Sequence, residues 1–270
     1  MRFSKKNAVD RGKSRVFWFF WVVLTLFLSH ANAAPPQKIL STNLCADFLL
    51  IYYVQQNVLK RERILALSPL LKRYGANIQS DLPNHRASVE DVLKRAPDII
   101  ITGAFDSPAT KATLQKMGFQ IYTLPFIQHI SDIPKMEKDF LKTLGIAPEL
   151  ARKPTLPKIA KNPKRLLLLG ASLIATGKKS FEDSLILAAG FQNAVDFAGF
   201  QTLSMEQIIK NPPDFLLYTT PFETPSFATN ILQNPVFSNI KKINTHNDWR
   251  WQCAGPWSWD LLENLKKISG

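Results

Sequence analysis

Short hydrophobic runs alternate along the chain with longer amphipathic segments, beginning at residue 37. Strands covered on both faces read as continuous apolar runs, whereas helices repeat their apolar positions every three to four residues. The pattern predicts strands at 38–43, 64–68, 98–102, 119–124, 165–169 and 241–244. It predicts helices at 46–59, 88–96, 108–117, 132–144, 181–189, 225–233 and 257–268, and loops at 170–179 and 190–202. This alternation is typical of α/β domains with mostly parallel sheets.

One helix-strand unit occurs twice in the sequence. The first copy runs from Ser88 to Ile101, and the second runs from Ser204 to Leu217, 116 positions later. Each copy reads as a short helix that begins at a serine cap, ends at a Pro-Asp pair and leads into a buried strand. Two spaced copies predict two similar lobes.

Each copy also carries local packing signals. Asp91 and Gln207 follow the capping serines by three residues, which is the spacing of a capping box. The apolar pairs Val92-Leu93 and Ile208-Ile209 are expected to face inward.

Both copies place a glutamate at the same position, Glu90 in the first and Glu206 in the second. A carboxylate near the start of a helix is stabilised by the helix dipole, by about 0.3–1 kcal/mol, which would explain a single glutamate. The same charge in both halves favours another role, because two lobes that dock on a two-fold symmetric partner need matched charges.

The first 33 residues have the parts of a secretory signal. Six basic residues precede an uncharged apolar run, and an Ala-x-Ala sequence ends at Ala33. We expect cleavage there, with an uncleaved anchor as the alternative. The remaining chain is expected to divide into an N-terminal lobe at 34–131, a connector at 132–164 and a C-terminal lobe at 165–270.

The charge and the motifs argue against two functional classes. Removing the signal lowers the net charge from +13 to +8, since that segment holds six basic residues and one acidic residue. The basic residues that remain are spread thinly, which argues against a nucleic-acid partner. No nucleophile elbow, phosphate loop or zinc-protease motif is present in the sequence, so no enzymatic activity and no cofactor are expected.

All four tryptophans of the mature chain lie between residues 249 and 259, beside an arginine and a cysteine. Aromatic side chains concentrated in a loop favour a surface for a large flat ligand. Trp249, Arg250 and Trp251 are interpreted as ligand contacts, because arginine can pair with a ligand carboxylate or phosphate. Trp257 is a further candidate, and for Trp257 and Trp259 packing of the last helix is an equal alternative.

Cys45 and Cys253 are the two cysteines of the chain, and both precede or begin predicted helices. In an exported protein two cysteines most often pair, so a disulfide is predicted, with two free thiols near a metal centre as the alternative. The mature histidines, His85, His129 and His246, are widely separated and give no metal-ligand spacing.

Together the signal, the paired lobes and residues 93–101, 177–178 and 181–184 resemble the periplasmic binding proteins for iron complexes and vitamin B12 that serve ABC importers. The resemblance covers residues 38–265. It implies the class III fold, in which two α/β lobes with mostly parallel sheets are joined by a helical connector and hold the ligand in a cleft between them. The connector differs, because prolines at 148, 154, 157 and 163 predict that its helix ends early.

The resemblance also implies a function and roles for residues. Glu90 and Glu206 match the glutamates that meet arginines on the two permease subunits. Phe105 would lie on the rim of the cleft, with Trp249 in the ligand-contacting loop. The implied protein is a monomer in the periplasm of a Gram-negative bacterium, which delivers a corrinoid, ferric siderophore or haem to a permease dimer. Two alternatives are a carrier of bare zinc or manganese, for which His85, His129 and His246 would have to converge, and an exported enzyme.

Overall fold

The computed structural model describes residues 37–74, 78, 80–86, 88–150, 163–170, 173–218, 234–245, 248–251 and 253–269. The expected signal at 1–33 and the predicted helix at 225–233 lie outside the described residues. So do residues 151–162 of the connector, and His246. Within the described residues, none of the helices combines the length and the apolar character needed to cross a bilayer.

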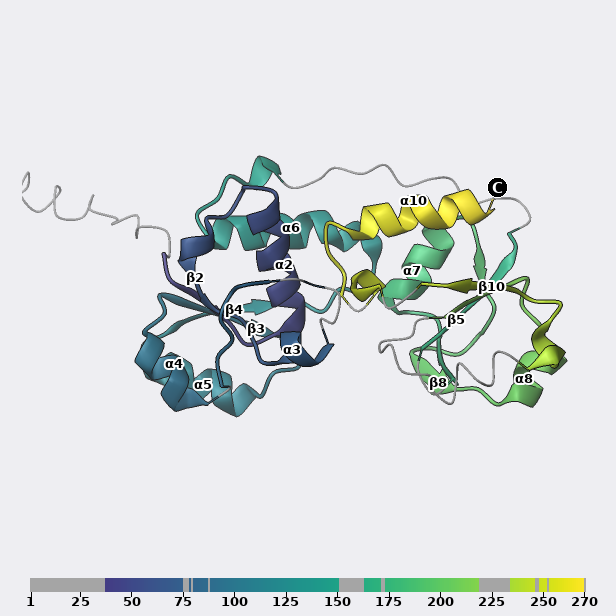
Figure 1. The fold of residues 1–270 in the computed structure, drawn as a ribbon, viewed down its shortest axis with the longest axis horizontal. Coiled ribbons are helices and arrows are strands. Elements are labelled where there is room, and N and C mark those ends of the chain that lie inside the picture. The colour runs from purple at the N-terminus through teal and green to yellow at the C-terminus, as the bar shows by residue number, and fades with distance from the viewer. Residues whose placement is uncertain are drawn as a thin grey trace, which may run out of the picture. The chain divides into compact units, whose positions relative to one another are not determined.

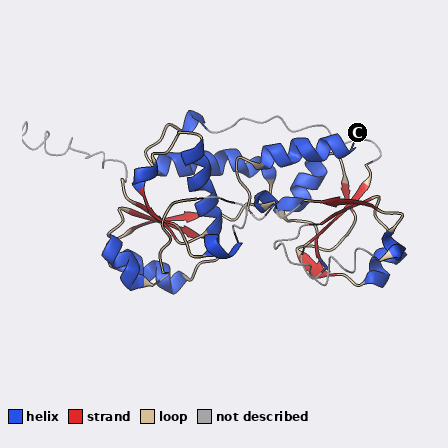
Figure 2. Cartoon of the chain, viewed as in Figure 1, coloured by secondary structure: helices blue, strands red, loops and turns tan. Residues whose placement is uncertain are grey.

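The first half of the chain builds a parallel four-stranded sheet in the order β2-β1-β3-β4 (Figures 1 and 2). Its strands are β1 (Ile39–Ser41), β2 (Ile64–Ala66), β3 (Ile99–Gly103) and β4 (Gln120–Leu124). Its helices are α2 (Leu44–Gln55), α3 (Leu70–Tyr74), α4 (Val89–Arg95), α5 (Pro108–Lys116) and α6 (Ile133–Thr143), with 3-10 turns η1 (Arg61–Arg63), η2 (Ile130–Asp132) and η3 (Pro148–Leu150). Helices α2 and α6 pack on one face of the sheet, and α4 and α5 pack on the other.

The second half builds a mixed sheet in the order β10-β9-β5-β6-β8, with β7 paired to β5. Its strands are β5 (Arg165–Leu169), β6 (Ile174–Thr176), β7 (Gln192–Asn193), β8 (Phe200–Thr202), β9 (Phe215–Tyr218) and β10 (Lys241–Asn244). Its helices are α7 (Phe181–Ala188), α8 (Met205–Lys210) and α10 (Ser258–Ser269), with 3-10 turns η5 (Pro235–Phe237) and η6 (Trp249–Trp251).

The predicted loops at 170–179 and 190–202 are wrong in part, because β6, β7 and β8 lie within them. Strand β6 runs antiparallel to both of its neighbours, β5 and β8, whereas β10, β9, β5 and β7 are mutually parallel. All three missed strands are only two or three residues long, and β8 is exposed throughout. Strands of two or three residues are too short to show a run or an alternation of apolar residues in the sequence.

The central strands are buried on both faces, as their apolar runs predicted. In β3, Ile99 and Ile101 join the largest core cluster, whereas Ile100 belongs to the separate cluster beneath α4 and α5. In β9, Phe215 and Leu217 join the same largest cluster and Leu216 faces away from it. The largest core therefore contains side chains from both sheets.

The repeated Pro-Asp pair has the same structural task in both halves. The Asp98 carboxylate accepts a hydrogen bond of 2.9 Å from the backbone amide of Lys38, which immediately precedes β1. The Asp214 carboxylate accepts one of 2.6 Å from the amide of Arg165, at the start of β5. Each aspartate thus fixes the beginning of the strand that pairs with its own strand, which explains why the sequence repeats it.

The predicted capping boxes differ between the copies. In α8 the box is complete, because Ser204 and Gln207 bond to each other's backbone amides. In α4 only half of it forms, since Ser88 accepts from the Asp91 amide while the Asp91 carboxylate accepts from the amide of Arg86, at 2.9 Å. Asp132, the residue before helix α6, makes no side-chain capping bond.

The prediction that both members of each apolar pair face inward is half wrong. Val92 and Ile208 are buried, but Leu93 is 44% exposed and Ile209 is 43% exposed. Successive residues of a helix point about 100° apart, so a short helix that touches the sheet along one narrow line buries one of two neighbours.

Candidate functional site

A disulfide between Cys45 and Cys253 joins the first turn of α2 to the loop before α10, with the two Cα atoms 5.4 Å apart. The predicted pairing is confirmed. Asn43 caps α2 by accepting hydrogen bonds from the amides of Cys45 and Ala46. The first helix is thereby held at its N-terminus both by a cap and by a covalent bond to the C-terminal part of the chain.

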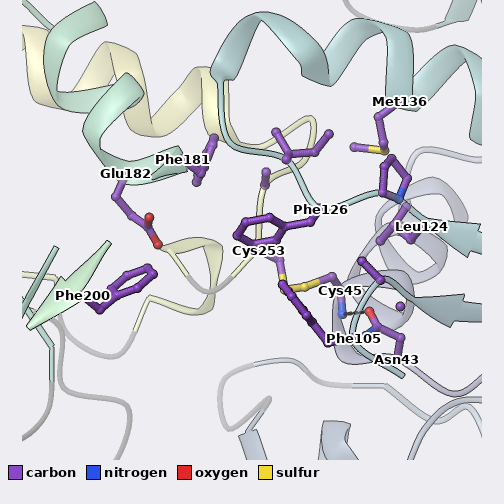
Figure 3. Close-up of a pocket in the computed structure, with 15 residues that line it drawn as sticks. Asn43, Cys45, Phe105, Leu124, Phe126, Met136, Phe181, Glu182, Phe200 and Cys253 are labelled. Atoms are coloured by element: carbon purple, nitrogen blue, oxygen red, sulfur yellow. Dashed lines mark hydrogen bonds between the residues drawn. A yellow bond between two sulfur atoms is a disulfide. The ribbon is translucent and has the colours of Figure 1, made fainter. Parts of the chain in front are cut away.

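A pocket lies beside this disulfide (Figure 3). Its lining residues come from the ends of β3 and β4, from α6, α7 and β8, and from the segments around the two cysteines. The lining residues are Asn43, Cys45, Gly103, Ala104, Phe105, Leu124, Pro125, Phe126, Ile127, Met136, Phe181, Glu182, Phe200, Cys253 and Ala254. The cavity measures ≈ 260 Å³. Pockets that enclose a drug-sized ligand usually hold roughly 300–1,000 Å³, so a larger ligand would rest partly outside this one.

Three phenylalanine rings form the exposed rim of the pocket. Phe105 is 81% exposed, Phe126 is 51% exposed and Phe200 is 56% exposed. The Phe105 and Phe126 rings meet edge to face, with their centroids 4.9 Å apart. Both follow the carboxyl ends of parallel strands, which is where open α/β sheets bind ligands. Exposed aromatic faces gathered at a cavity are suited to stacking against a flat ligand.

Of the rim residues, sequence reasoning found Phe105 and missed Phe126 and Phe200. Phe126 could have been found, because it follows strand 120–124 in the same way that Phe105 follows the strand before it. Phe200 lies in β8, one of the missed strands, and no signal in the sequence marked it.

The predicted tryptophan surface lies in the core rather than along this pocket. Trp249 is half-buried, with its ring centroid 4.7 Å from that of Phe48 and 4.8 Å from that of Trp257. Trp251, Trp257 and Trp259 are buried, and Trp257 donates a 2.8 Å hydrogen bond from Nε1 to the Cys253 carbonyl. Among the five predicted ligand residues, Phe105 is the one that lines this pocket. The roles proposed for Trp249, Trp251 and Trp257 stay predictions.

Arg250 is engaged by its neighbour Asp248. Its Nε lies 2.8 Å and 3.0 Å from the two carboxylate oxygens, and Nη2 adds another contact. The hydrogen bond to Asp248 raises the pKa of Arg250 above its ordinary value. A ligand carboxylate would have to compete with Asp248 for this guanidinium, so ligand binding by Arg250 also stays a prediction.

Glu182 is the one ionisable side chain among the described residues that line the pocket. It follows Phe181 at the start of α7 and is partly buried. Burial raises the pKa of Glu182, while hydrogen bonds from its own backbone amide and the Ser180 hydroxyl act in the opposite direction.

The two candidate docking glutamates occupy equivalent and exposed positions. Glu90 is the second residue of α4, its side chain is 76% exposed, and its carboxylate lies 2.8 Å from Lys94 Nζ. Glu206 is the second residue of α8 and is also exposed. A hydrogen bond from Ser204 lowers the pKa of Glu206, so it is ionised at neutral pH.

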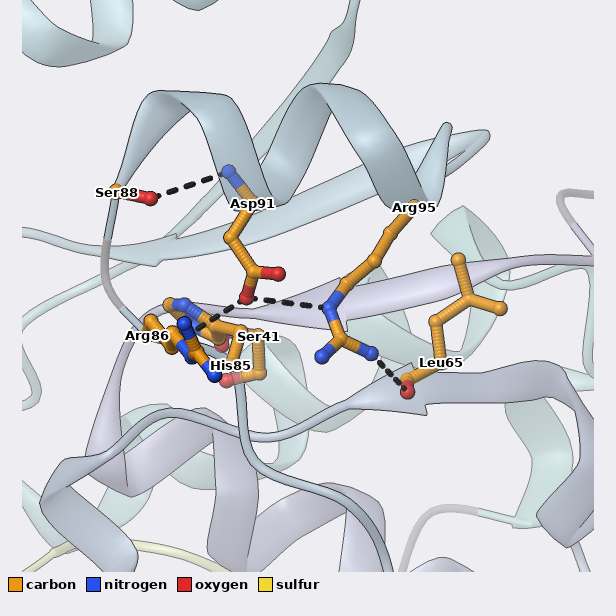
Figure 4. A network of polar contacts seen from close by, with 7 residues as sticks. All are labelled: Ser41, Leu65, His85, Arg86, Ser88, Asp91 and Arg95. Carbon is orange, nitrogen blue, oxygen red and sulfur yellow. Dashed lines mark hydrogen bonds and ion pairs between the residues drawn. The ribbon is translucent and has the colours of Figure 1, made fainter.

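Two other residues of α4, Asp91 and Arg95, make polar contacts that anchor the helix (Figure 4). The Asp91 carboxylate accepts from the Arg86 amide and from Arg95 Nε, and Arg95 continues to the Leu65 carbonyl in β2. Because Asp91 and Arg95 hold α4 to the sheet, Glu90 is left to solvent.

His85 and His129 each have a local partner. His85 is buried, its Nε2 lies 2.9 Å from the Ser41 carbonyl, and burial lowers its pKa. His129 Nδ1 lies 2.6 Å from the Ser131 hydroxyl. In the part of the chain that the structure describes, no group of three or more metal-ligating side chains comes together.

No protein-family model matches the chain, and no curated protein sequence matches it. Solved structures do. A periplasmic heme-binding protein from Roseiflexus sp. RS-1 is 19% identical, with a TM-score of 0.62 over 87% of this chain and 99% of its own. A periplasmic vitamin B12-binding protein of Vibrio cholerae is 18% identical, with a TM-score of 0.60 over 87% of this chain and 98% of its own. A periplasmic solute-binding protein from Veillonella parvula is 18% identical, with a TM-score of 0.64 over 87% of this chain and 81% of its own.

These likenesses establish the fold of the chain. It is the class III periplasmic binding protein fold, so the predicted fold class is confirmed. The second sheet differs in detail from the prediction, because it is mixed rather than mostly parallel near its β8 edge.

Proposed function

We propose that this protein is the substrate-binding component of an ABC importer, which captures a flat metal chelate in the periplasm and does not catalyse a reaction. The observation that carries the proposal is the pocket whose rim presents three exposed phenylalanine rings beside the disulfide. The predicted signal at 1–33 supports export, and a disulfide supports an oxidising compartment.

The candidate ligands are a corrinoid such as vitamin B12, haem or a ferric siderophore. Solved structures with the same fold carry the names of heme-binding and vitamin B12-binding proteins, which supports this ligand class. Among the described residues, no observation favours the alternative of a bare zinc or manganese ion.

Isothermal titration calorimetry of the purified protein tests the ligand class. Vitamin B12, hemin, a ferric siderophore and Zn²⁺ would be titrated separately. We expect saturable binding of one chelate at one site per chain, and we expect that binding to weaken in Phe105→Ala. Saturable binding of Zn²⁺ with no response to any chelate would overturn the proposal and restore the metal-ion alternative.

We further propose that Glu90 and Glu206 dock the loaded protein on a two-fold symmetric permease. Their matched positions on α4 and α8, their exposure and the ionised state of Glu206 support this role. Opposite charges across an interface steer association and set its register. We propose that the protein acts as a monomer with lobes at 34–131 and 165–270, so that each lobe meets one permease subunit.

The docking proposal is tested by uptake of labelled ligand into cells that carry the native importer. The double variant Glu90→Ala/Glu206→Ala should lose uptake while its ligand affinity in calorimetry is unchanged. Glu263→Ala, which removes an exposed carboxylate from α10, is the matched control and should retain uptake. Normal uptake by the double variant would contradict the docking role.

A further inference from the structure

The polar side chains that line the pocket differ in how many bonds they already form within the protein. Asn43 directs its side-chain oxygen to the backbone amides of Cys45 and Ala46. The two cysteine sulfurs are bonded to each other. The Glu182 carboxylate accepts from its own backbone amide and from the Ser180 hydroxyl, but its two oxygens offer about four acceptor sites, so it keeps capacity for a donor on a bound molecule.

The start of α7 explains why Glu182 faces the pocket. Ser180 caps the helix by accepting a 3.0 Å hydrogen bond from the Asp183 amide, and the Asp183 carboxylate accepts one of 2.8 Å from Asn193. These two polar residues stabilise the helix and its neighbouring loop. In Figure 3 the Glu182 side chain leaves α7 on the pocket side, and its carboxylate lies near the Phe200 ring.

No lysine or arginine of the described chain forms an ion pair with Glu182. A partly buried carboxylate without a cationic partner attracts hydrogen-bond donors and repels ionised carboxylates, and the effect is stronger than it would be in open water. Phe126 and Phe200 flank the same space, so a flat ligand stacked on the rim would bring its edge toward Glu182.

We propose that Glu182 is a specificity-determining residue of the pocket, which selects a macrocycle with amide N–H donors at its edge over one with ionised carboxylates there. This inference rests on the proposed function and narrows its ligand class to an amide-bearing corrinoid rather than haem. Vitamin B12 carries amide side chains around its ring, whereas haem carries two propionates. The three phenylalanine rings hold either macrocycle by its faces, and Glu182 distinguishes the two by their edges.

Calorimetric titration with vitamin B12 and with hemin tests the selection in three proteins. The unaltered protein should bind vitamin B12 more tightly than hemin. Glu182→Lys should weaken vitamin B12 binding by about tenfold and strengthen hemin binding by about tenfold, because the charge at the ligand's edge is reversed. Glu182→Gln keeps an acceptor and the shape of the side chain, so it should lose discrimination against hemin with only about a threefold loss of vitamin B12 affinity.

Glu263→Lys on α10 makes the same change in net charge outside the pocket lining and should leave both affinities unaltered. The inference would be overturned if hemin bound the unaltered protein as tightly as vitamin B12 does. It would also be overturned if the hemin-to-B12 ratio stayed constant in both Glu182 variants, and in either case the proposed function would stand. An unaltered protein that bound no chelate at all would overturn the proposed function and this inference with it.

Discussion

Two groups of aromatic side chains, one on the rim of the pocket and one in the segment that contains Cys253, differ in nearly every physical respect. The rim group, Phe105, Phe126 and Phe200, is exposed and comes from three separate segments of the sequence. The tryptophan group lies within residues 249–259 and is mostly buried, with Trp249 and Trp257 packed on α2. The tryptophans, which are close together in the sequence, thus pack in the core. The three phenylalanines, which are far apart in the sequence, come together at the pocket.

The difference teaches how to interpret aromatic clusters in a sequence. Four neighbouring indoles bring much apolar area to one place, and burying that area stabilises the fold most effectively. Aromatic residues that are costly to expose and yet lie on the rim of a cavity have no such structural role. The two groups should therefore respond differently to mutation. Changes in the tryptophans should lower the stability of the fold, and changes in the phenylalanines should lower ligand affinity.

The largest expected effect is on stability in the tryptophan group. Trp257→Ala should lower the free energy of unfolding by about 3–5 kcal/mol, because it leaves a large cavity and removes the hydrogen bond to the Cys253 carbonyl. Urea denaturation measures it. A loss below about 1 kcal/mol together with a large loss of ligand affinity would instead place Trp257 among the ligand contacts.

Cys45 and Cys253 line the pocket and Cys253 lies within the tryptophan segment, so removal of the disulfide should affect both groups. Cys45→Ser/Cys253→Ser should lower the free energy of unfolding by about 2–4 kcal/mol, because the bond closes a long loop in the unfolded chain. Ligand affinity should also fall, since both cysteines line the pocket. Urea denaturation and calorimetry of the same variant measure the two effects. Unchanged affinity would show that the rim keeps its geometry without the bond.

A pH-dependent effect should arise in α2, the helix on which the tryptophans pack. Burial raises the pKa of Asp47 to about 7 from its ordinary 3.8, although Ser41 and Ser68 hydrogen-bond to the carboxyl group. Because the folded state holds the proton more tightly than the unfolded state, stability from Asp47 is complete below about pH 4 and is lost as the pH rises toward 7.

Between about pH 5 and pH 7 this loss should amount to about 2 kcal/mol. Urea denaturation at the two pH values, on the unaltered protein and on Asp47→Asn, isolates the contribution. In the asparagine variant, the free energy of unfolding should fall by about 2 kcal/mol less over this pH range than in the unaltered protein. Parallel pH profiles would contradict a raised pKa for Asp47.

The smallest expected change in free energy is at the rim. Phe105→Ala should weaken binding of the chelate by about tenfold, or about 1–2 kcal/mol, because a stacking face is lost. Its stability should change by less than about 0.5 kcal/mol, since the side chain is 81% exposed. Met117→Ala, an exposed apolar residue on no part of the pocket lining, is the control in calorimetry. Equal affinities in the two variants would remove Phe105 from the site.

The sequence predicted the parts of the fold that rest on local chemistry. The repeated serine caps, the ends of α4 and α8 and the buried strands β3 and β9 lie within one or two residues of their predicted bounds. The Pro-Asp pairs were recognised as a repeat, and their hydrogen bonds to the neighbouring strands emerged only from the structure. The outward turn of Leu93 and Ile209 depends on how narrowly α4 and α8 touch their sheets, which no local pattern encodes.

The candidate site was less predictable, because it is assembled from segments far apart in the chain. Phe105 was predicted because it follows a strand. The cysteine pair was predicted because the chain has two cysteines. Glu182 and Phe200 reach the same pocket from α7 and β8, and neither carried a sequence signal that tied it to Phe105. Which face of the tryptophan segment meets solvent likewise depends on α2, which is about 200 positions away in the sequence.

The disulfide also makes the protein topologically close to a ring. It links residues 208 positions apart, so most of the sequence lies inside one covalent loop. A single cut by a protease anywhere between residues 46 and 252 would leave both fragments in one molecule. The same bond can form only after the whole segment between Cys45 and Cys253 has been synthesised, because it joins residues 208 positions apart.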